Sequence, residues 1–155
     1  MATGRSRTLA LRLAAAIIAA TVAATPVLAC SSDPKAPEPT TAALFKDAKL
    51  VFFARMVRTE ERAEPDNHGW PVVEGRYRIL ETFKGRPDPN GVVLDPAFGA
   101  GNCALGLLAG SDYVFFVNEA GYVVSPTGSR MVLNRAAAPV KQLLAELRGL
   151  SQRPK

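Results

Sequence analysis

The order of the predicted elements constrains the fold of this 155-residue chain more than any other feature of its sequence. One short helical segment is followed by several β-rich segments and then by one amphipathic helix. Strand–helix–strand alternation is missing, which argues against a parallel doubly wound sheet. Short strands in this order bury their apolar side chains most simply in a small antiparallel barrel, closed or half closed, with a helix packed against it. The sequence therefore predicts a mainly β fold with flanking helices.

The predicted elements follow from residue type and periodicity. A short helix begins at Thr41 in TAALFKDA, where Thr40 or Thr41 can cap its first turn. The last helix is APVKQLLAELRGL, whose apolar residues recur at i, i+3, i+4 and i+7 from Val140 and which Gly149 can end. Strands are predicted for residues 50–58, 70–85 and 91–95, and a β-hairpin for residues 111–126 that turns at residues 118–121.

The longest predicted strand separates its apolar and basic residues by parity. Tyr77, Ile79 and Phe83 share one face, so they are expected in the core. A basic stripe lies in and beside this strand: Arg76, Arg78, Lys84 and Arg86. Such a stripe on a small β-barrel can bind a nucleic-acid strand when aromatic residues lie on the same face as the cations. The aromatic residues here have the opposite parity to the arginines of the strand, so nucleic acid is not expected as a partner.

The first 29 residues are predicted to be a secretory signal peptide, not part of the fold. Arg5, Arg7 and Arg12 give a basic start, residues 13–24 form an apolar run, and small or aliphatic residues lead up to Ala29. Twelve helical residues rise about 18 Å, too little for a hydrocarbon core of about 30 Å. The mature chain is therefore expected to be exported. Its predicted parts are a Pro-rich N-terminal segment (30–40), one domain (41–150) and a tail (151–155).

Net charge gives no argument for nucleic acid or an anionic membrane as a partner. The chain carries a formal net charge of +5, but three of its nineteen basic residues lie in the leader. The other sixteen face fourteen acidic residues, which leaves a net charge of +2. Attraction of polyanions by the field of the whole protein needs a larger excess of positive charge.

The residue after the predicted cleavage site is Cys30, and two fates are open for it. General signal peptidase would leave a mature chain that begins with a free cysteine able to form a disulfide. Alternatively, Val27-Leu28-Ala29-Cys30 is a lipobox, the sulfur of Cys30 carries a lipid, and residues 31–39 tether the domain to a membrane. The two fates exclude each other, because a thioether sulfur cannot also form a disulfide. A membrane is expected as a partner only in the second case.

The chain has two cysteines, Cys30 and Cys103. An even count in an exported chain suggests one bridge, and two unpaired thiols are the alternative. A bridge closing a loop of about 74 residues would remove unfolded-state entropy worth roughly 4 kcal/mol. No CxxC pair occurs, so the cysteines do not indicate a metal site or thioredoxin-like chemistry.

Three segments, in this order, resemble one known family. They are AKLVFFARMV, the strand YRILETFKG, and NCALGLLAGSDYVFFV, in which a cysteine in a Gly-rich loop precedes a β-rich run. Together with a leader that ends at a cysteine, they resemble bacterial proteins of the netrin-like domain class, which includes the tissue inhibitors of metalloproteinases. The likeness covers residues 30–150. It implies an OB-like five-stranded antiparallel barrel with a C-terminal helix, and a bridge from Cys30 to Cys103.

The resemblance also implies a function. In the animal inhibitors of this class, the N-terminal cysteine chelates the zinc of a protease through its α-amine and carbonyl oxygen, and a small hydroxyl residue follows it. Cys30 and Ser31 match these positions, whereas Ser32 stands where the inhibitors have a further cysteine. An α-amine titrates near physiological pH, so part of it is neutral and can donate a lone pair to zinc.

The resulting prediction is an exported, non-catalytic protein-binding module. Its candidate partner is a zinc metalloprotease, which it would inhibit through the mature N-terminal cysteine. The alternative is a lipid-anchored lipoprotein of the cell envelope, in which Cys30 carries the lipid. The inhibitor interpretation places the protein outside the cell, and the lipoprotein interpretation places it at the cell envelope.

No other motif indicates catalysis or a bound cofactor. GAGNCA, residues 99–104, matches part of a dinucleotide fingerprint, but no helix is predicted after it, so a tight turn is the better interpretation. His68 is the only histidine, lies in a polar loop and has no nucleophile near it in sequence. Trp70, beside Pro71, is expected to cover one end of the barrel, with a role as a partner anchor as the alternative. Without an acid–base pair or a metal triad, the chain is predicted not to be an enzyme and to need no cofactor.

An acidic cluster lies at the predicted hairpin tip: Glu60, Glu61, Glu64 and Asp66, interrupted by Arg62. Carboxylate oxygens are the ligands that Ca²⁺ prefers. The spacing matches no known calcium loop, so the prediction is a solvated hairpin tip without a metal.

Overall fold

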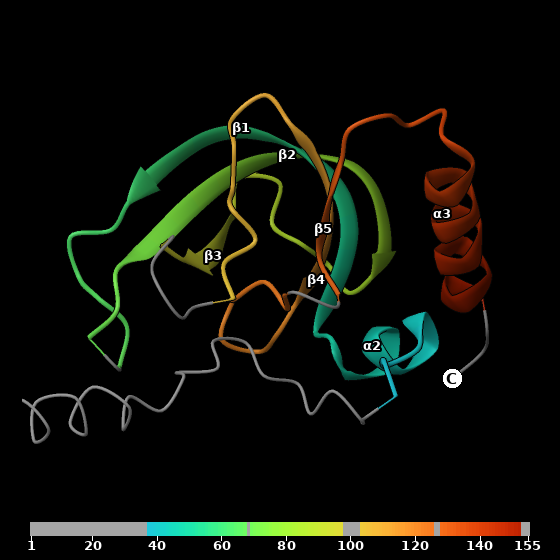
Figure 1. The fold of residues 1–155 in the computed structure, drawn as a ribbon, viewed down its shortest axis with the longest axis horizontal. Helices are drawn as coiled ribbons and strands as arrows, with labels where there is room; N and C mark the ends of the chain where they lie inside the picture. Colours follow the sequence, from blue (N-terminus) through green and yellow to red (C-terminus); the bar gives the residue numbers. More distant parts are fainter. Residues whose placement is uncertain (1–36, 68, 98–102, 126–127, 153–155) are drawn as a thin grey trace, which may run out of the picture.

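The computed structural model describes residues 37–67, 69–97, 103–125 and 128–152. The described chain forms one five-stranded antiparallel sheet with a helix before it and a helix after it (Figure 1). In chain order the elements are α2 (Thr41–Asp47), β1 (Leu50–Glu61), β2 (Val72–Lys84), β3 (Val92–Pro96), β4 (Asp112–Val117), β5 (Arg130–Val132) and α3 (Ala138–Ser151). The predicted class, mainly β with flanking helices, is confirmed. The predicted signal peptide, with Cys30 and Ser31 after it, lies outside the described residues.

Both ends of α2 are fixed by side chains. The hydroxyl oxygen of Thr40 accepts a hydrogen bond from the backbone N–H of Ala43 at 3.2 Å, so Thr40 is the N-cap. At the other end, the ammonium group of Lys84 donates to three carbonyl oxygens within residues 45–48, at 2.6–2.7 Å. A cation at this end also stabilises the helix dipole. Lys84 therefore links β2 to α2 and does not belong to a free basic stripe.

The strand order is β3-β2-β1-β4-β5, and all neighbouring strands are antiparallel. β1 and β2 bend as long arches across the molecule (Figure 1). Their ladder has three register irregularities, two of which leave Val57 and Leu80 without a partner in the opposite strand. Bulges of this kind bend a strand and increase its twist. β1 also continues to Glu61, beyond the predicted end at Arg58, because it keeps pairing with β2.

The sheet does not close into the predicted barrel by a continuous ladder. Within the described residues, β3 and β5 are the open edges. The segment after β4 spans the gap through isolated bridges: Leu94 of β3 bridges Tyr122 in parallel, and Val123 bridges Val117 of β4. Gly121 turns this segment with a φ of +88°, and its carbonyl oxygen accepts a hydrogen bond from the N–H of Leu94 at 3.0 Å. Because the segment alongside β3 is short, closure is limited to these bridges.

The predicted hairpin turn at residues 118–121 forms, since the N–H of Asn118 donates to the carbonyl oxygen of Tyr122 at 2.9 Å. Its return arm pairs with β4 only briefly, through Val123 and Val124, and the fifth strand is β5 instead. The reason lies in Ser129, which is 1% exposed. Its hydroxyl oxygen accepts a hydrogen bond from the N–H of Phe116 at 2.9 Å and donates one to the carbonyl oxygen of Phe116 at 3.0 Å. This side chain replaces one ladder position, and β5 begins at the next residue. At the C-terminus, α3 runs past the predicted end at Gly149 to Ser151.

β1 separates two apolar cores because its side chains alternate between the two faces of the sheet. One core lies between the sheet and α3, and contains Val51, Phe53, Phe83, Val114, Phe116, Val132, Leu143, Leu144 and Leu147. The other lies inside the curve of the sheet, and contains Phe52, Ala54, Met56, Tyr77, Val93, Leu107, Tyr113, Phe115, Val117 and Val123. Tyr77 and Phe83 are both buried, as predicted, but they do not share one face: Tyr77 lies in the inner core with Ile79 beside it, and Phe83 lies in the core under α3. The bulge at Leu80 reverses the alternation of β2 between them.

Candidate protein-binding site

Three connections meet at the end of the sheet that lies away from α3 (Figure 1). The N–H of Ala97, just after β3, donates to the carbonyl oxygen of Pro71 in the β1–β2 connection at 2.9 Å. The N–H of Val123, in the β4–β5 connection, donates to the carbonyl oxygen of Leu94 at 2.9 Å. Between the connections lies a cavity of about 510 Å³, whose lining residues we call the loop end: Arg62, Glu64, Pro65, Asp66, Asn67, Leu94, Pro96, Ala120 and Tyr122.

A tight turn shapes the outer wall of the loop end. The carboxylate of Asp66 accepts a hydrogen bond from the N–H of Trp70 at 2.8 Å, and the N–H of Asp66 donates to the carbonyl oxygen of Trp70 at 2.9 Å. Trp70 is 41% exposed, so it offers apolar surface next to the turn that Asp66 closes. This position suits the partner-anchor interpretation better than a cover for the barrel end. His68 lies outside the described residues.

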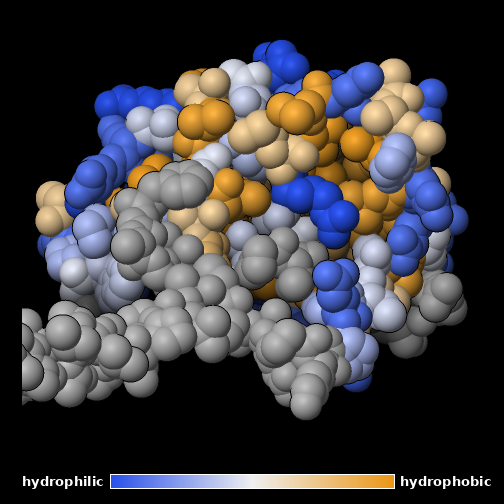
Figure 2. Space-filling view, in the orientation of Figure 1, coloured by the Kyte–Doolittle hydropathy of each residue, from blue (hydrophilic) through white to orange (hydrophobic). Residues whose placement is uncertain are grey.

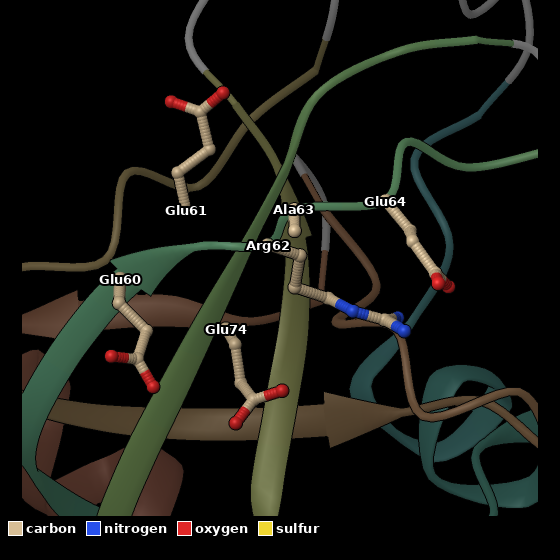
Figure 3. Close-up of a pocket in the computed structure, with 6 residues that line it drawn as sticks. All are labelled: Glu60, Glu61, Arg62, Ala63, Glu64 and Glu74. Atoms are coloured by element: carbon tan, nitrogen blue, oxygen red, sulfur yellow. The ribbon is translucent and has the colours of Figure 1, made fainter.

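A second cavity, of about 410 Å³, adjoins the loop end and is lined by Glu60, Glu61, Arg62, Ala63, Glu64 and Glu74 (Figure 3). Glu60 and Glu74 are ladder partners, and Figure 3 shows Glu61 pointing away from both. The carboxylate of Glu60 also pairs with Arg58 at 2.6 Å. In the part of the chain that the structure describes, no three metal-ligating side chains come together.

The loop that follows Cys103 is anchored by a buried carboxylate. Asp95, at the end of β3, is 1% exposed. It accepts hydrogen bonds from the N–H groups of Leu105 at 3.0 Å and Gly106 at 2.8 Å. Burial raises the pKa of Asp95, and the two backbone donors oppose that shift only in part. Asp95 thus connects the end of β3 to the loop through one side chain.

Tyr113 holds the same loop from β4. Its hydroxyl group donates to the carbonyl oxygen of Gly106 at 2.9 Å and accepts a hydrogen bond from the N–H of Leu108 at 2.8 Å. Tyr113 is fully buried, and burial raises the pKa of its phenol. Gly106 itself has a φ of +75°, a conformation that favours glycine. Two buried side chains and one backbone turn therefore fix the path of the chain from residue 105 to residue 108.

The sequence-predicted site residues fall into two groups. Cys103 is described and half-buried, two residues before the anchored loop. Cys30 and Ser31 lie outside the described residues, so the bridge to Cys103 and the zinc-chelating or lipidated end stay predictions. Arg76, Arg78 and Arg86 are exposed. Residues 103–108 form no helix, and residues 99–102 of GAGNCA lie outside the described residues, so the tight turn there stays a prediction.

Asp95 and Tyr113 are the site residues that sequence reasoning missed. Asp95 ends the apolar strand VVLDP, where an aspartate looks like an ordinary turn residue. A signal was present, because its parity places it on the same face as Val93, which is buried in the core. A carboxylate at a core position needs donors, and the Gly-rich loop is the nearest source of free N–H groups.

Comparison with known proteins adds no assignment: no family model matches the chain, and no curated protein matches its sequence. Among the described residues, no helix has the length and apolar character required to cross a membrane.

Proposed function

We propose that this chain is an exported, non-catalytic protein-binding module whose partner contacts the loop after Cys103 and the loop end together with the mature N-terminus. The observation that carries the proposal is the anchoring of the loop after Cys103 by Asp95 and Tyr113. A surface that is rigid before binding loses less conformational entropy on association. Two buried polar side chains devoted to one loop give it that rigidity.

The resemblance to the netrin-like class supports a more specific version, inhibition of a zinc metalloprotease. The strand order and the parallel bridge between Leu94 and Tyr122 fit a partly open five-stranded barrel of the OB type. A disulfide between Cys30 and Cys103 would tie the new N-terminus to the anchored loop. The α-amine and carbonyl oxygen of Cys30 would then face the zinc of the protease, with Ser31 directed toward its specificity pocket.

An inhibition assay tests this version. A chain that begins at Cys30 is compared with the same chain carrying one extra N-terminal alanine, against a zinc endopeptidase. The extra residue converts the α-amine into an amide nitrogen, which has no lone pair to donate to zinc. We expect the extended form to lose potency by at least about tenfold, the equivalent of one weak interaction. Equal potency of the two forms would rule out chelation by the α-amine.

The contribution of the anchored loop is tested by Asp95→Asn, with Asp47→Asn at the exposed end of α2 as the matched control. The amide nitrogen of asparagine cannot accept a hydrogen bond, so one of the two contacts to the loop is lost. We expect weaker binding for Asp95→Asn and unchanged binding for Asp47→Asn. If both variants bind the partner like the parent chain, the anchored loop is not part of the binding surface.

The second candidate function is a lipid-anchored envelope protein, which the sequence Val27-Leu28-Ala29-Cys30 and the Pro-rich residues after it favour. Lipidation would place the domain at a membrane through a thioether on Cys30. Processing is then sensitive to globomycin, and the precursor accumulates in its presence. Insensitive processing, or a disulfide at Cys30, excludes this candidate.

A further inference from the structure

The outer face of β1 and β2 carries charges that work against strand pairing. The ladder places Arg55 opposite Arg78, and Arg58 opposite Arg76. Like charges directly opposite each other destabilise an antiparallel pair. We call these four residues the arginine strip. Two successive pairs of this kind break a local rule of sheet design, and such violations concentrate at functional surfaces.

The arginine strip lies on the side of the sheet that the solvent reaches. The pair between the two arginine pairs, Met56 and Tyr77, faces the inner core, so the arginines face outward. α3 covers only the part of the outer face around Phe53. The side chains of Arg58 and Arg76 are 67% and 53% exposed. Figure 2 shows hydrophilic side chains gathered over the part of β1 and β2 that lies away from α3.

The carboxylates around the arginine strip neutralise it only in part. Arg58 pairs with Glu60 at 2.6 Å, and Arg76 lies 3.9 Å from Glu74. The side chain of Arg78 makes no ion pair or hydrogen bond with any residue that the structure describes. The strip therefore keeps an excess of positive charge.

Arg55 adds to this excess. It pairs with Asp112 at 2.8 Å, but Asp112 is shared with Arg135, which lies 2.7 Å from it. One carboxylate thus serves two guanidinium groups. The outer face around Arg55 is left with a net positive charge, which an anionic partner would neutralise.

The arginine strip is narrow and has acidic borders. Glu60 and Glu74 form the next outward pair on one side. On the other side the next outward pair contains Glu81, whose carboxylate is held by Arg148 at 2.7 Å. The bulged residues Val57 and Leu80 add exposed apolar surface beside the arginines, at 61% and 36% exposure. The surface thus combines cations and apolar groups within two pairs of residues.

We propose that the arginine strip binds an extended acidic segment of a protein partner. Guanidinium groups bind carboxylates through two parallel hydrogen bonds, which ammonium groups cannot do. Alternate side chains of an extended segment lie about 7 Å apart, which is also the spacing of successive outward pairs in a ladder. The strip is only two outward pairs long, a length that one extended segment covers, whereas a broad anionic membrane surface would extend over its borders.

Peptide binding to the purified full chain tests the proposal by fluorescence anisotropy. The probe is a labelled peptide of alternating Glu and Val residues, and the matched control peptide has Gln in place of Glu. The test variant is Arg76→Gln/Arg78→Gln. The control variant is Arg86→Gln/Lys141→Gln, which makes the same change in net charge at exposed positions elsewhere. Vesicles of phosphatidylglycerol and phosphatidylcholine serve as the competing anionic surface.

We expect the full chain to bind the Glu peptide and not the Gln peptide. The test variant should bind it at least about tenfold more weakly, because charge-assisted hydrogen bonds are lost, and the control variant should bind it normally. Equal affinity of the two variants would overturn the proposal. So would the absence of binding to the Glu peptide, or a preference of the full chain for the anionic vesicles.

Discussion

Asp95 and Asp112 are both nearly inaccessible carboxylates of the same sheet, with exposures of 1% and 7%, but their surroundings are opposite in kind. Asp95 accepts hydrogen bonds from two uncharged backbone N–H groups of a loop. Asp112 accepts hydrogen bonds from the guanidinium groups of Arg55 and Arg135. Burial raises the pKa of Asp95, whereas the hydrogen bond from Arg55 is the main cause of the lowered pKa of Asp112. Opposite pKa shifts thus arise from one residue type in one sheet.

The comparison distinguishes two roles. Asp112 stabilises the fold, whereas Asp95 fixes the conformation of the loop after Cys103. Asp112 joins β1 to the chain that leads into α3, and its charge is compensated. The charge of Asp95 has no such compensation from its two donors, so its burial opposes folding. A group that opposes folding while fixing one loop supports a functional role for the geometry of that loop.

The largest effect in this comparison is expected for Asp112→Ala. It leaves Arg55 and Arg135 without their shared partner and should destabilise the fold by about 2–3 kcal/mol, since hydrogen bonds to charged groups contribute about 1.5–3 kcal/mol each and both arginines are partly hydrated. Urea unfolding measures the change. Glu81→Ala, which removes the half-buried partner of the exposed Arg148, is the matched control, with an expected loss below about 1 kcal/mol. A larger loss of stability for Glu81→Ala than for Asp112→Ala would mean that the pair of Glu81 and Arg148, and not Asp112, is the main stabilising ion pair.

A smaller and local effect is expected for Asp95→Ala. The loss of two hydrogen bonds is partly offset by the removal of a buried charge, so the free energy of unfolding should fall by only about 1 kcal/mol. Amide hydrogen exchange should accelerate at Leu105 and Gly106, while the amides of β1 stay protected. Uniform acceleration across the sheet would mean that Asp95 supports the whole fold and not the loop.

The two carboxylates should also give opposite pH dependences. The pKa of Asp112 is lower in the fold than in the unfolded chain, where aspartate titrates at about 3.9, so its stabilising contribution is lost as the pH falls through its folded pKa. The pKa of Asp95 is higher in the fold, so its contribution is lost as the pH rises through its folded pKa.

Urea unfolding at several pH values checks this difference in sign. Asp112→Asn should lack the gain in stability that the parent chain shows as the pH rises below about 4. Asp95→Asn should lack a decline that the parent chain shows above about 4. Superimposable pH profiles of the two variants would show that the two sites do not differ.

The smallest effect is expected for the arginine strip. Arg76→Gln/Arg78→Gln removes one member of each opposed arginine pair, so stability should stay within about 0.5 kcal/mol of the parent chain or rise slightly. Thermal unfolding at low ionic strength is the most sensitive measurement, because salt screens exposed charges. A fall in the free energy of unfolding of more than about 1 kcal/mol would mean that these arginines stabilise the sheet, and would contradict a role in binding a partner.

Local signals made part of the fold predictable. Thr40 caps α2 through a contact three residues away, and the burial of Tyr77 between exposed Arg76 and Arg78 follows from the strand period alone. The class of the fold, mainly β with a C-terminal helix, follows from the order of such segments. These features depend on neighbours in sequence, which the sequence displays directly.

The candidate sites depend on contacts that the sequence does not display. The bulges at Val57 and Leu80 determine which arginines face each other across the ladder. The residue pattern does not predict the positions of these bulges. The position of β5 depends on Ser129. The hydroxyl group of this residue takes the place of a backbone partner for Phe116 only after Ser129 has been buried against β4. The role of Asp95 appears only when the Gly-rich loop has folded over it.

The most direct measurement is mass spectrometry of the mature protein, digested without reduction, at residue 30. Our account predicts a peptide with an unmodified N-terminal amine, joined by a disulfide to the peptide that contains Cys103. A lipid-modified Cys30, or a Cys103 peptide without Cys30 attached, would contradict it.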